Sequence, residues 1–265
     1  MDFQPYSPGE ANNFLFDFLE AKADQYNNPR FIESDPISVP HLFYKKEDIE
    51  IAAFFTATIA WGQRNTIIRN ARQIMLMMDD SPFQFITGAA PSDLGRFSSF
   101  VHRTFNGNDV IFFIRSLQNI YKNYGGLEKL FMQAIKANGA DAKDGLHYFR
   151  QVFFSIPHPQ HAGRHVADVV AGSAAKRLNM FLRWMVRNDN RGVDFGIWKG
   201  VRMNQLYCPL DLHSGQVARK LSLLRRKQND WRAVEGLTAA LRTFNPSDPV
   251  KYDFALFGLG VFEKF

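Results

Sequence analysis

A lysine and an aspartate, 35 residues apart, each stand at the expected start of a helix in this 265-residue chain. Lys176 follows the segment GSAA at 172–175 and opens a basic amphipathic stretch, whereas Asp211 lies in the segment CPLDLH at 208–213. An amine that loses its proton easily attacks carbon as a nucleophile, and a carboxylate beside it stabilises positive charge that develops there. The two residues therefore predict covalent catalysis through an amine.

The expected helix start explains why this lysine would be reactive. If Ser173 caps the helix, Lys176 lies in the first turn, at the positive end of the helix dipole, where a cation is disfavoured. Like charge from Arg177 and Arg183 should also favour the neutral amine. Two plainer roles stay open. Asp211 is a good N-cap in its own right, and Lys176 in a basic helix face is suited to bind phosphate.

These motifs resemble the helix-hairpin-helix DNA glycosylases of base-excision repair, over about residues 50 to 265. In that family a catalytic lysine lies near the start of one helix. A catalytic aspartate lies in a proline, apolar, Asp, x, His segment that starts a later helix. Lys176 and Asp211 take these places. Their spacing is most similar to the archaeal 8-oxoguanine glycosylase branch. The chain also resembles an uncharacterised bacterial family known only as a domain of unknown function.

The resemblance implies a base-excision repair glycosylase with AP-lyase activity, acting on an oxidised purine such as 8-oxoguanine, with duplex DNA as its partner. It also implies that Gln63, at a helix junction, fills the gap that an extruded nucleotide leaves. Gln63 as an ordinary polar residue and Trp61 as a core residue remain alternatives. A non-catalytic nucleic-acid-binding protein of the same fold is the alternative function. The residues expected to contact DNA are Gln63, Trp61, Arg64, Arg177, Arg183, His213 and Arg219.

The sequence departs from the resembled family in three segments. No leucine-proline-glycine-valine-glycine hairpin precedes Lys176, and only the residues AGS at 171–173 remain there. The single cysteine, Cys208, excludes the four-cysteine iron–sulfur cluster of many relatives. Residues 98–108 match a hairpin poorly. These departures bear on the mode of DNA binding more than on the fold.

Composition indicates a globular chain with a large core. Hydrophobic residues make up 46% and phenylalanine alone contributes 26. One cysteine is typical of a reducing compartment. The N-terminus shows no secretion signal, and the apolar run at 51–62 is too short to span a bilayer. We therefore expect a cytoplasmic protein, nucleoid-associated if it binds DNA, without a membrane partner. The sequence does not indicate an oligomeric state.

No cofactor or metal is expected. Three histidines cluster at His158, His161 and His165, but the surrounding sequence lacks the carboxylate or cysteine pattern of a zinc site. Positive charge is concentrated instead. The net charge is +6, yet residues 176–232 hold thirteen Lys/Arg against four Asp/Glu, a local +9. Concentrated positive charge is typical of a phosphate-binding surface, although basic helix faces are often merely solvated.

The elements that must position these residues are all helical, since no stretch alternates as a strand does. We expect an all-α, glycosylase-like, two-lobed fold with a central cleft. The chain would be a single unit whose lobes cover about 45–165 and 166–265, the second including the N-terminal helix. Predicted helices lie at 8–26, 47–78 with a break at 61–64, from 81, from 108 or 109 to 124, and at 127–137, 176–187, 214–226, 231–244 and 252–257.

Overall fold

The computed structural model describes residues 8–138 and 141–265, and these are mostly helical, which confirms the all-α class. The α-helices are α1 (Pro8–Tyr26), α2 (Arg30–Ser34), α3 (Lys46–Thr58), α4 (Arg64–Leu76), α5 (Pro82–Gly88), α6 (Gly107–Tyr124), α7 (Leu127–Asn138), α8 (Ala142–Phe153), α9 (Lys176–Val186), α10 (Leu212–Lys220), α11 (Trp231–Phe244) and α12 (Tyr252–Val261). The 3₁₀ turns are η1 (Pro36–Ser38), η2 (Pro40–Leu42), η3 (Pro91–Phe97), η4 (Gln160–Arg164), η5 (Met203–Gln205) and η6 (Pro249–Lys251).

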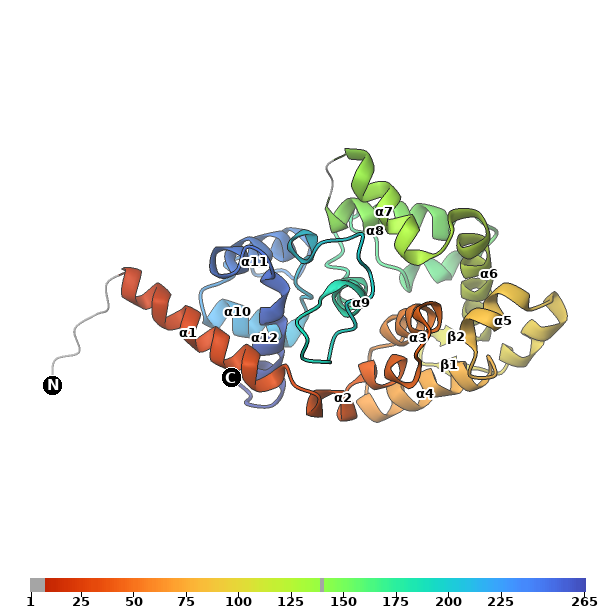
Figure 1. Ribbon diagram of the computed structural model, residues 1–265, viewed down its shortest axis with the longest axis horizontal. Coiled ribbons are helices and arrows are strands. Elements are labelled where there is room, and N and C mark those ends of the chain that lie inside the picture. Colours follow the sequence, from red (N-terminus) through yellow and green to blue (C-terminus); the bar gives the residue numbers. More distant parts are fainter. Residues whose placement is uncertain (1–7, 139–140) are drawn as a thin grey trace.

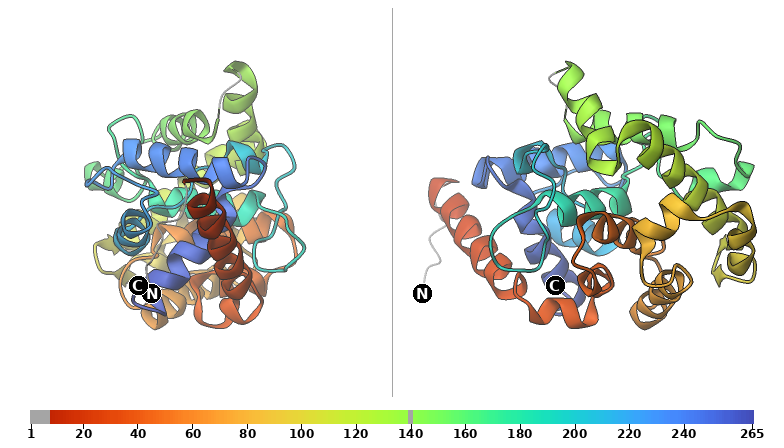
Figure 2. Two further views of the ribbon diagram at one scale, coloured as in Figure 1. Left: turned by 90° about the vertical axis from the view of Figure 1, so that its left-hand side faces the viewer. Right: turned by 45° about the vertical axis from the view of Figure 1, so that its right-hand side comes forward.

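The helices gather on two sides of α9. Figure 1 shows α1, α10, α11 and α12 on one side and α3 to α8 on the other. On the first side α12 contacts both α1 and α10, while on the second α3 contacts α4 and α5, and α7 contacts α8. Helix α9 packs against α3. The views in Figure 2 also place the N-terminal helix beside the C-terminal helices, so the segment between α1 and α3 crosses from one side to the other.

Most predicted helices are present, and their ends differ where local hydrogen bonding decides them. Helix α6 is capped by Asn106, not by residue 108 or 109, because the Asn106 side chain accepts from the N–H of Asn108 while Asp109 accepts from the N–H of Asn106. The helix predicted at 214–226 ends at Lys220, since Ser222 turns left-handed at φ 59°. The basic residues 225–227 therefore lie beyond α10.

Several elements were not predicted, namely the short helix α2, the 3₁₀ turns, helix α8 and a β-ribbon. Helix α8 has buried residues at Leu146, Phe149 and Phe153, a helical spacing. A two-residue antiparallel ribbon pairs β1 (Val101–His102) with β2 (Phe105–Asn106) in the segment 98–108. Within the described residues, no helix is both long and apolar enough to cross a bilayer.

The core on the α3 side is built from phenylalanine. The Phe54 ring of α3 has neighbouring ring centroids at 5.4 to 6.4 Å, and it is fully buried. These rings come from α3, α6, α8 and α9: Phe55, Phe113, Phe149, Phe153 and Phe181. Offset and edge-on aromatic pairs add to the energy of burying apolar area. This cluster fixes α9 against the larger group of helices.

A buried network of charges fixes α9 on its other side. Arg183 pairs with Asp194 at 3.2 Å and with Asp253 of α12 at 2.5 Å. Arg187 pairs with the same Asp194 at 3.2 Å and with Asp248 at 2.9 Å. Removing one member of such a buried pair leaves an uncompensated charge, which typically costs about 3–5 kcal/mol. The network thus holds α9, which begins with Lys176, in one position relative to α12.

Glu50 of α3 gives a prediction about stability. Its side chain is 1% exposed and accepts hydrogen bonds from Tyr121 Oη at 2.8 Å and from Trp198 Nε1 at 2.7 Å. Burial raises the pKa of Glu50 from 4.5 to about 7, against the effect of these donors and of Lys46. Between these two pKa values, 4.5 and about 7, the folded protein binds more protons than the unfolded chain. The free energy of unfolding should therefore fall as the pH rises through this range.

We expect Glu50→Gln to remove that share of the pH dependence, about 3 kcal/mol at most. Urea unfolding of both proteins between about pH 4.5 and pH 7.5 measures it. Glu47→Gln, one turn earlier on the same helix, is the matched control. A variant whose stability falls with pH as steeply as the wild type would contradict the assignment.

Candidate functional site

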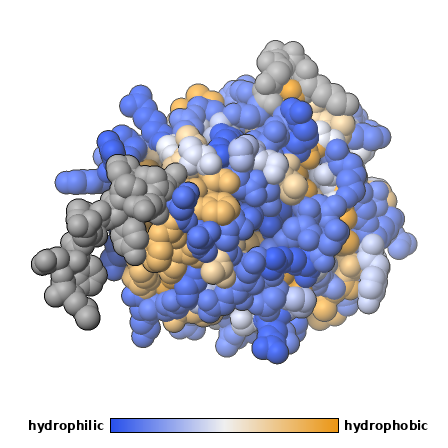
Figure 3. Space-filling view, turned by 60° about the vertical axis from the view of Figure 1, so that its left-hand side comes forward, coloured by the Kyte–Doolittle hydropathy of each residue, from blue (hydrophilic) through white to orange (hydrophobic). Residues whose placement is uncertain are grey.

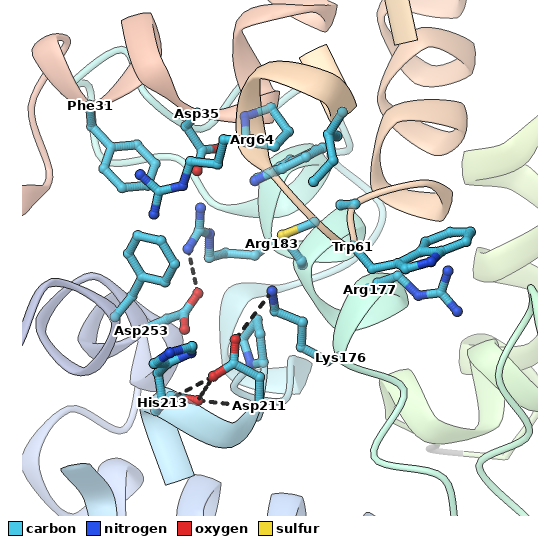
Figure 4. A pocket seen from close by; sticks show the side chains of 18 of the residues that line it. Phe31, Asp35, Trp61, Arg64, Lys176, Arg177, Arg183, Asp211, His213 and Asp253 are labelled. Atoms are coloured by element: carbon cyan, nitrogen blue, oxygen red, sulfur yellow. Dashed lines mark hydrogen bonds and ion pairs between the residues drawn. The ribbon is translucent and has the colours of Figure 1, made fainter. Parts of the chain in front are cut away.

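A cleft of about 450 Å³ lies where α9, α10 and α12 meet the segment after α2 and the α3–α4 loop. Figure 4 shows the polar side chains that line it. The residues labelled there are Phe31, Asp35, Trp61, Arg64, Lys176, Arg177, Arg183, Asp211, His213 and Asp253. A concave pocket of this size, apolar in most of its lining with a few convergent charged groups, is typical of a binding or active site.

The structure brings Lys176 and Asp211 together in this cleft. Lys176 Nζ lies 3.4 Å from Asp211 Oδ2, and the two side chains are 29% and 27% exposed. They come from the starts of α9 and α10, which are separated by an irregular segment of the chain. An amine and a carboxylate that share one half-buried cleft can act on the same bound molecule.

The start of α9 differs from the one predicted. The N-cap is Ala175, in a left-handed conformation at φ 46°, and Ser173 does not cap the helix. Ser173 Oγ instead accepts from the N–H of Ala175 at 3.3 Å, and Ser173 forms a β-bridge with Asp230. A left-handed alanine costs of order 1–3 kcal/mol and persists where surrounding contacts enforce it. Lys176 is therefore the first residue of α9, without a side-chain cap before it.

Asp211 combines both roles that its sequence allowed. Its Oδ1 accepts from the N–H of Ser214 at 3.0 Å as the N-cap of α10, and its Oδ2 faces Lys176. Burial acts to raise the pKa of Asp211, but Lys176, the Ser214 N–H and His213 together lower it below its ordinary value. The carboxylate is therefore held ionised beside the amine.

Trp61 and Arg177 form one wall of the cleft. The Arg177 guanidinium lies 4.7 Å from the Trp61 ring centroid and donates to the carbonyl of Thr58. Burial lowers the pKa of Arg177 to about 10. The Trp61 ring also stacks on His165 at 6.0 Å and meets His102 edge-on at 5.0 Å. Trp61 is half-buried, so it is packed as a core residue on one side and lines the cleft on the other.

Arg64 lines the cleft, whereas its neighbour in the chain, Gln63, is not among the lining residues. Gln63 is exposed, is the N-cap residue of α4 and makes no side-chain capping bond. Arg64 lines the cleft, with its guanidinium 5.1 Å from the Phe257 ring and 5.5 Å from the Phe262 ring. The predicted break at 61–64 is present, and Gly62 turns the chain there at φ 106°.

The remaining predicted DNA contacts lie in different settings. His213 is exposed and lines the cleft. Arg219 lies outside the cleft lining, where its Nε donates to the carbonyl of Arg226 at 2.8 Å. Arg183 is 4% exposed and paired with Asp194 and Asp253, so its guanidinium is not free to bind phosphate. We correct its role to one of positioning α9.

Sequence reasoning missed two carboxylates of the cleft. Burial raises the pKa of Asp253 to about 6, while Arg183 and Lys176 lower it. Burial also raises the pKa of Asp35, against the effect of Arg183, Arg64 and Lys176. Asp253 is the second residue of the helix predicted at 252–257, and Asp35 directly precedes a proline. Neither aspartate lies in a motif, or at a regular spacing from another polar residue, that would indicate a functional site.

The histidine cluster has a carboxylate partner that the local sequence did not show. Asp109 of α6 is fully buried, with His161 Nε2 at 3.0 Å and His165 Nε2 at 3.4 Å. Burial acts to raise the pKa of Asp109, but the histidines and the Asn106 N–H lower it overall. In the described parts of the chain, no group of three or more His, Cys, Asp or Glu side chains is arranged so that it could hold a metal ion. Asp109 and His165 therefore support Trp61 from behind the cleft.

The basic surface is smaller than the local charge predicted. Arg183 and Arg187 are buried in ion pairs, Arg191 pairs with Asp24, and Arg226 pairs with Asp230. Hydrophilic residues cover most of the face seen in Figure 3, with apolar side chains in smaller areas. The counted excess of +9 therefore overstates the cations that are free to meet phosphate.

Comparison with known proteins gives one match. The model of a family described as "Protein of unknown function (DUF2400)" fits residues 35–262, which is most of the chain. A search of curated proteins and a search of solved structures found no match. The matched range includes the cleft residues from Asp35 to Asp253.

Proposed function

The chain belongs to the family described as protein of unknown function (DUF2400), and since that description names no activity, we propose one from the site. The protein is a DNA base-excision repair glycosylase with AP-lyase activity on an oxidised purine such as 8-oxoguanine. Its fold is the two-lobed helix-hairpin-helix glycosylase fold, with the cleft between the lobes. The observation that carries the proposal is the 3.4 Å approach of Lys176 Nζ to Asp211 Oδ2 inside the cleft.

The proposed reaction uses the two side chains in sequence. Asp211 accepts one proton from the Lys176 ammonium, and the free amine attacks C1′ of the extruded nucleoside. The bond between C1′ and the base breaks, and the base leaves with the proton that Asp211 held. The attached nitrogen then gives a second proton to O4′ as the C1′–O4′ bond opens, which leaves an iminium. The ionised Asp211 stabilises the positive charge that develops on the sugar.

The other cleft residues suit an extruded nucleotide. Phe31 and Phe257 contribute aromatic rings to the lining of the cleft that holds Lys176, and base stacking on aromatic rings contributes about 1–3 kcal/mol per base. Arg64 in the cleft lining and the exposed Arg225 after α10 are available to phosphate.

Borohydride trapping tests the proposal against a non-catalytic DNA-binding protein of the same fold. Borohydride reduces an iminium to a stable amine, so an active enzyme becomes covalently attached to its DNA. We expect trapping on duplexes that carry 8-oxoguanine. Salt-dependent duplex binding, with neither trapping nor base release across oxidised, deaminated and alkylated bases, would favour the binding protein instead.

Gln63 gives a prediction specific to paired DNA. If Gln63 fills the gap left by the extruded nucleotide, Gln63→Ala should slow base release from a duplex by roughly five- to thirtyfold, since unstacking costs a few kcal/mol and a wedge offsets part of it. Release from single-stranded DNA should change little, because no gap is left there. Single-turnover rates on the two substrates measure the difference.

The exposed Gln73, on the same helix, gives the matched control Gln73→Ala. Equal losses by Gln63→Ala on duplex and single-stranded substrates would count against the wedge.

A further inference from the structure

Asp35 is a buried carboxylate with one oxygen left for a ligand. It is 8% exposed, and it lines the same cleft as Lys176. Its Oδ1 accepts from the N–H of Ile37 at 3.0 Å, as the N-cap of η1. Among the described residues, Oδ2 has no hydrogen-bond partner. A buried carboxylate without a full set of partners is costly unless a ligand supplies them.

The surroundings of Asp35 indicate what that ligand is. Figure 4 shows Asp35 on the side of the cleft away from Asp211, with Lys176 and Arg183 between them. Phe31 lies close by in the same figure and offers an aromatic face. Asp35 thus lies across the cleft from the Lys176–Asp211 pair, where the proposed function puts the sugar.

We propose that Asp35 determines base specificity by accepting hydrogen bonds from N–H groups on the far edge of the base, which selects a guanine-derived over an adenine-derived purine. This inference rests on the proposed glycosylase function. The nearby cations Arg183, Arg64 and Lys176 favour the ionised form of Asp35 against the effect of burial. In that form the carboxylate only accepts hydrogen bonds. The pairing edge of guanine presents the adjacent donors N1–H and N2–H. Adenine presents the acceptor N1 beside its amino group, and that lone pair would face the carboxylate.

The size of the effect follows from the burial. Some sites are built to hydrogen-bond polar groups of their substrate. Such a site discriminates by up to roughly 10⁴–10⁵-fold against an analogue that leaves the polar groups of the site unpaired. Asp35 has one oxygen already used by Ile37, so a smaller ratio is expected here. We expect the wild-type protein to release 8-oxoguanine at least about a hundredfold faster than 8-oxoadenine.

The test compares three substrates under single-turnover conditions. They are duplexes with 8-oxoguanine, with 8-oxoadenine and with a preformed abasic site, which has no base to read. Asp35→Asn keeps the acceptor for Ile37 but turns an amide donor toward the base. We expect release of 8-oxoguanine to fall by at least about thirtyfold, release of 8-oxoadenine to change little, and abasic incision to stay within about twofold.

Two further variants control for folding. Asp35→Ser also caps η1 but lacks the second oxygen, so it should show the same loss on 8-oxoguanine. Asp93→Asn, which alters a capping carboxylate outside the cleft, should leave all three rates unchanged.

Four results would overturn the role of Asp35. They are equal release of both oxidised purines by the wild type, unchanged rates in Asp35→Asn, an equal loss on all three substrates, and incision of abasic sites without release of either base. The last result leaves the lyase chemistry in place. A wild-type protein that acts on none of the three contradicts the proposed function itself.

Discussion

Lys176→Gln should abolish borohydride trapping and lower base release by roughly 10⁴-fold or more, because it removes the proposed nucleophile. Glutamine keeps a polar, unbranched side chain that is one atom shorter, but it has no basic amine. Duplex binding should weaken only slightly, since the substitution removes one cation from a region with thirteen. Gel-resolved trapping and fluorescence anisotropy, at the same salt concentration, measure the two effects.

The matched control is Lys227→Gln. Lys227 is exposed beyond α10 and lies outside the cleft, so this variant loses the same charge without touching the site. We expect its trapping to equal that of the wild type. Persistent trapping in Lys176→Gln would show that another amine is the nucleophile. Loss of trapping in both variants would indicate that charge, and not the position of Lys176, was limiting.

The sequence predicted the helices because their signals are local. Helical spacing and a proline at the first position are read from neighbouring residues, and α1, α5 and α11 begin where predicted. The sequence paired Lys176 with Asp211 in one predicted site because of the motif around each helix start. The sequence could not show that they lie 3.4 Å apart, because that distance is set by the packing of α9 against α3 and α12.

The residues that were missed depend on contacts distant in sequence. Asp35 enters the cleft because the segment after α2 crosses between the two sides, which no local pattern records. Asp109 lies more than fifty residues before the histidines it pairs with. Arg183 was counted as a surface cation because its aspartate partners come from a loop and from α12. Charge counts along a chain do not separate exposed cations from paired ones.

Asp211→Asn separates chemistry from folding at the second residue of the site. Asparagine caps helices about as well as aspartate, so it should still accept from the N–H of Ser214 and retain α10. The amide is neutral, so it neither takes the proton of Lys176 nor stabilises charge on the sugar. We expect single-turnover base release to fall roughly 10²- to 10⁴-fold. The substitution removes a negative charge from the cleft, so duplex affinity should stay equal or rise.

Asp230→Asn is the matched control for this experiment. Asp230 also caps a helix, accepts from the N–H of Ala233 at 3.0 Å and pairs with a cation, Arg226, yet it lies outside the cleft lining. Its variant should release base at the wild-type rate. If both variants lose activity in parallel with their melting temperatures, Asp211 acts through the helix cap alone. If Asp211→Asn melts like the wild type, binds DNA and yet turns over slowly, the carboxylate that faces Lys176 takes part in the reaction.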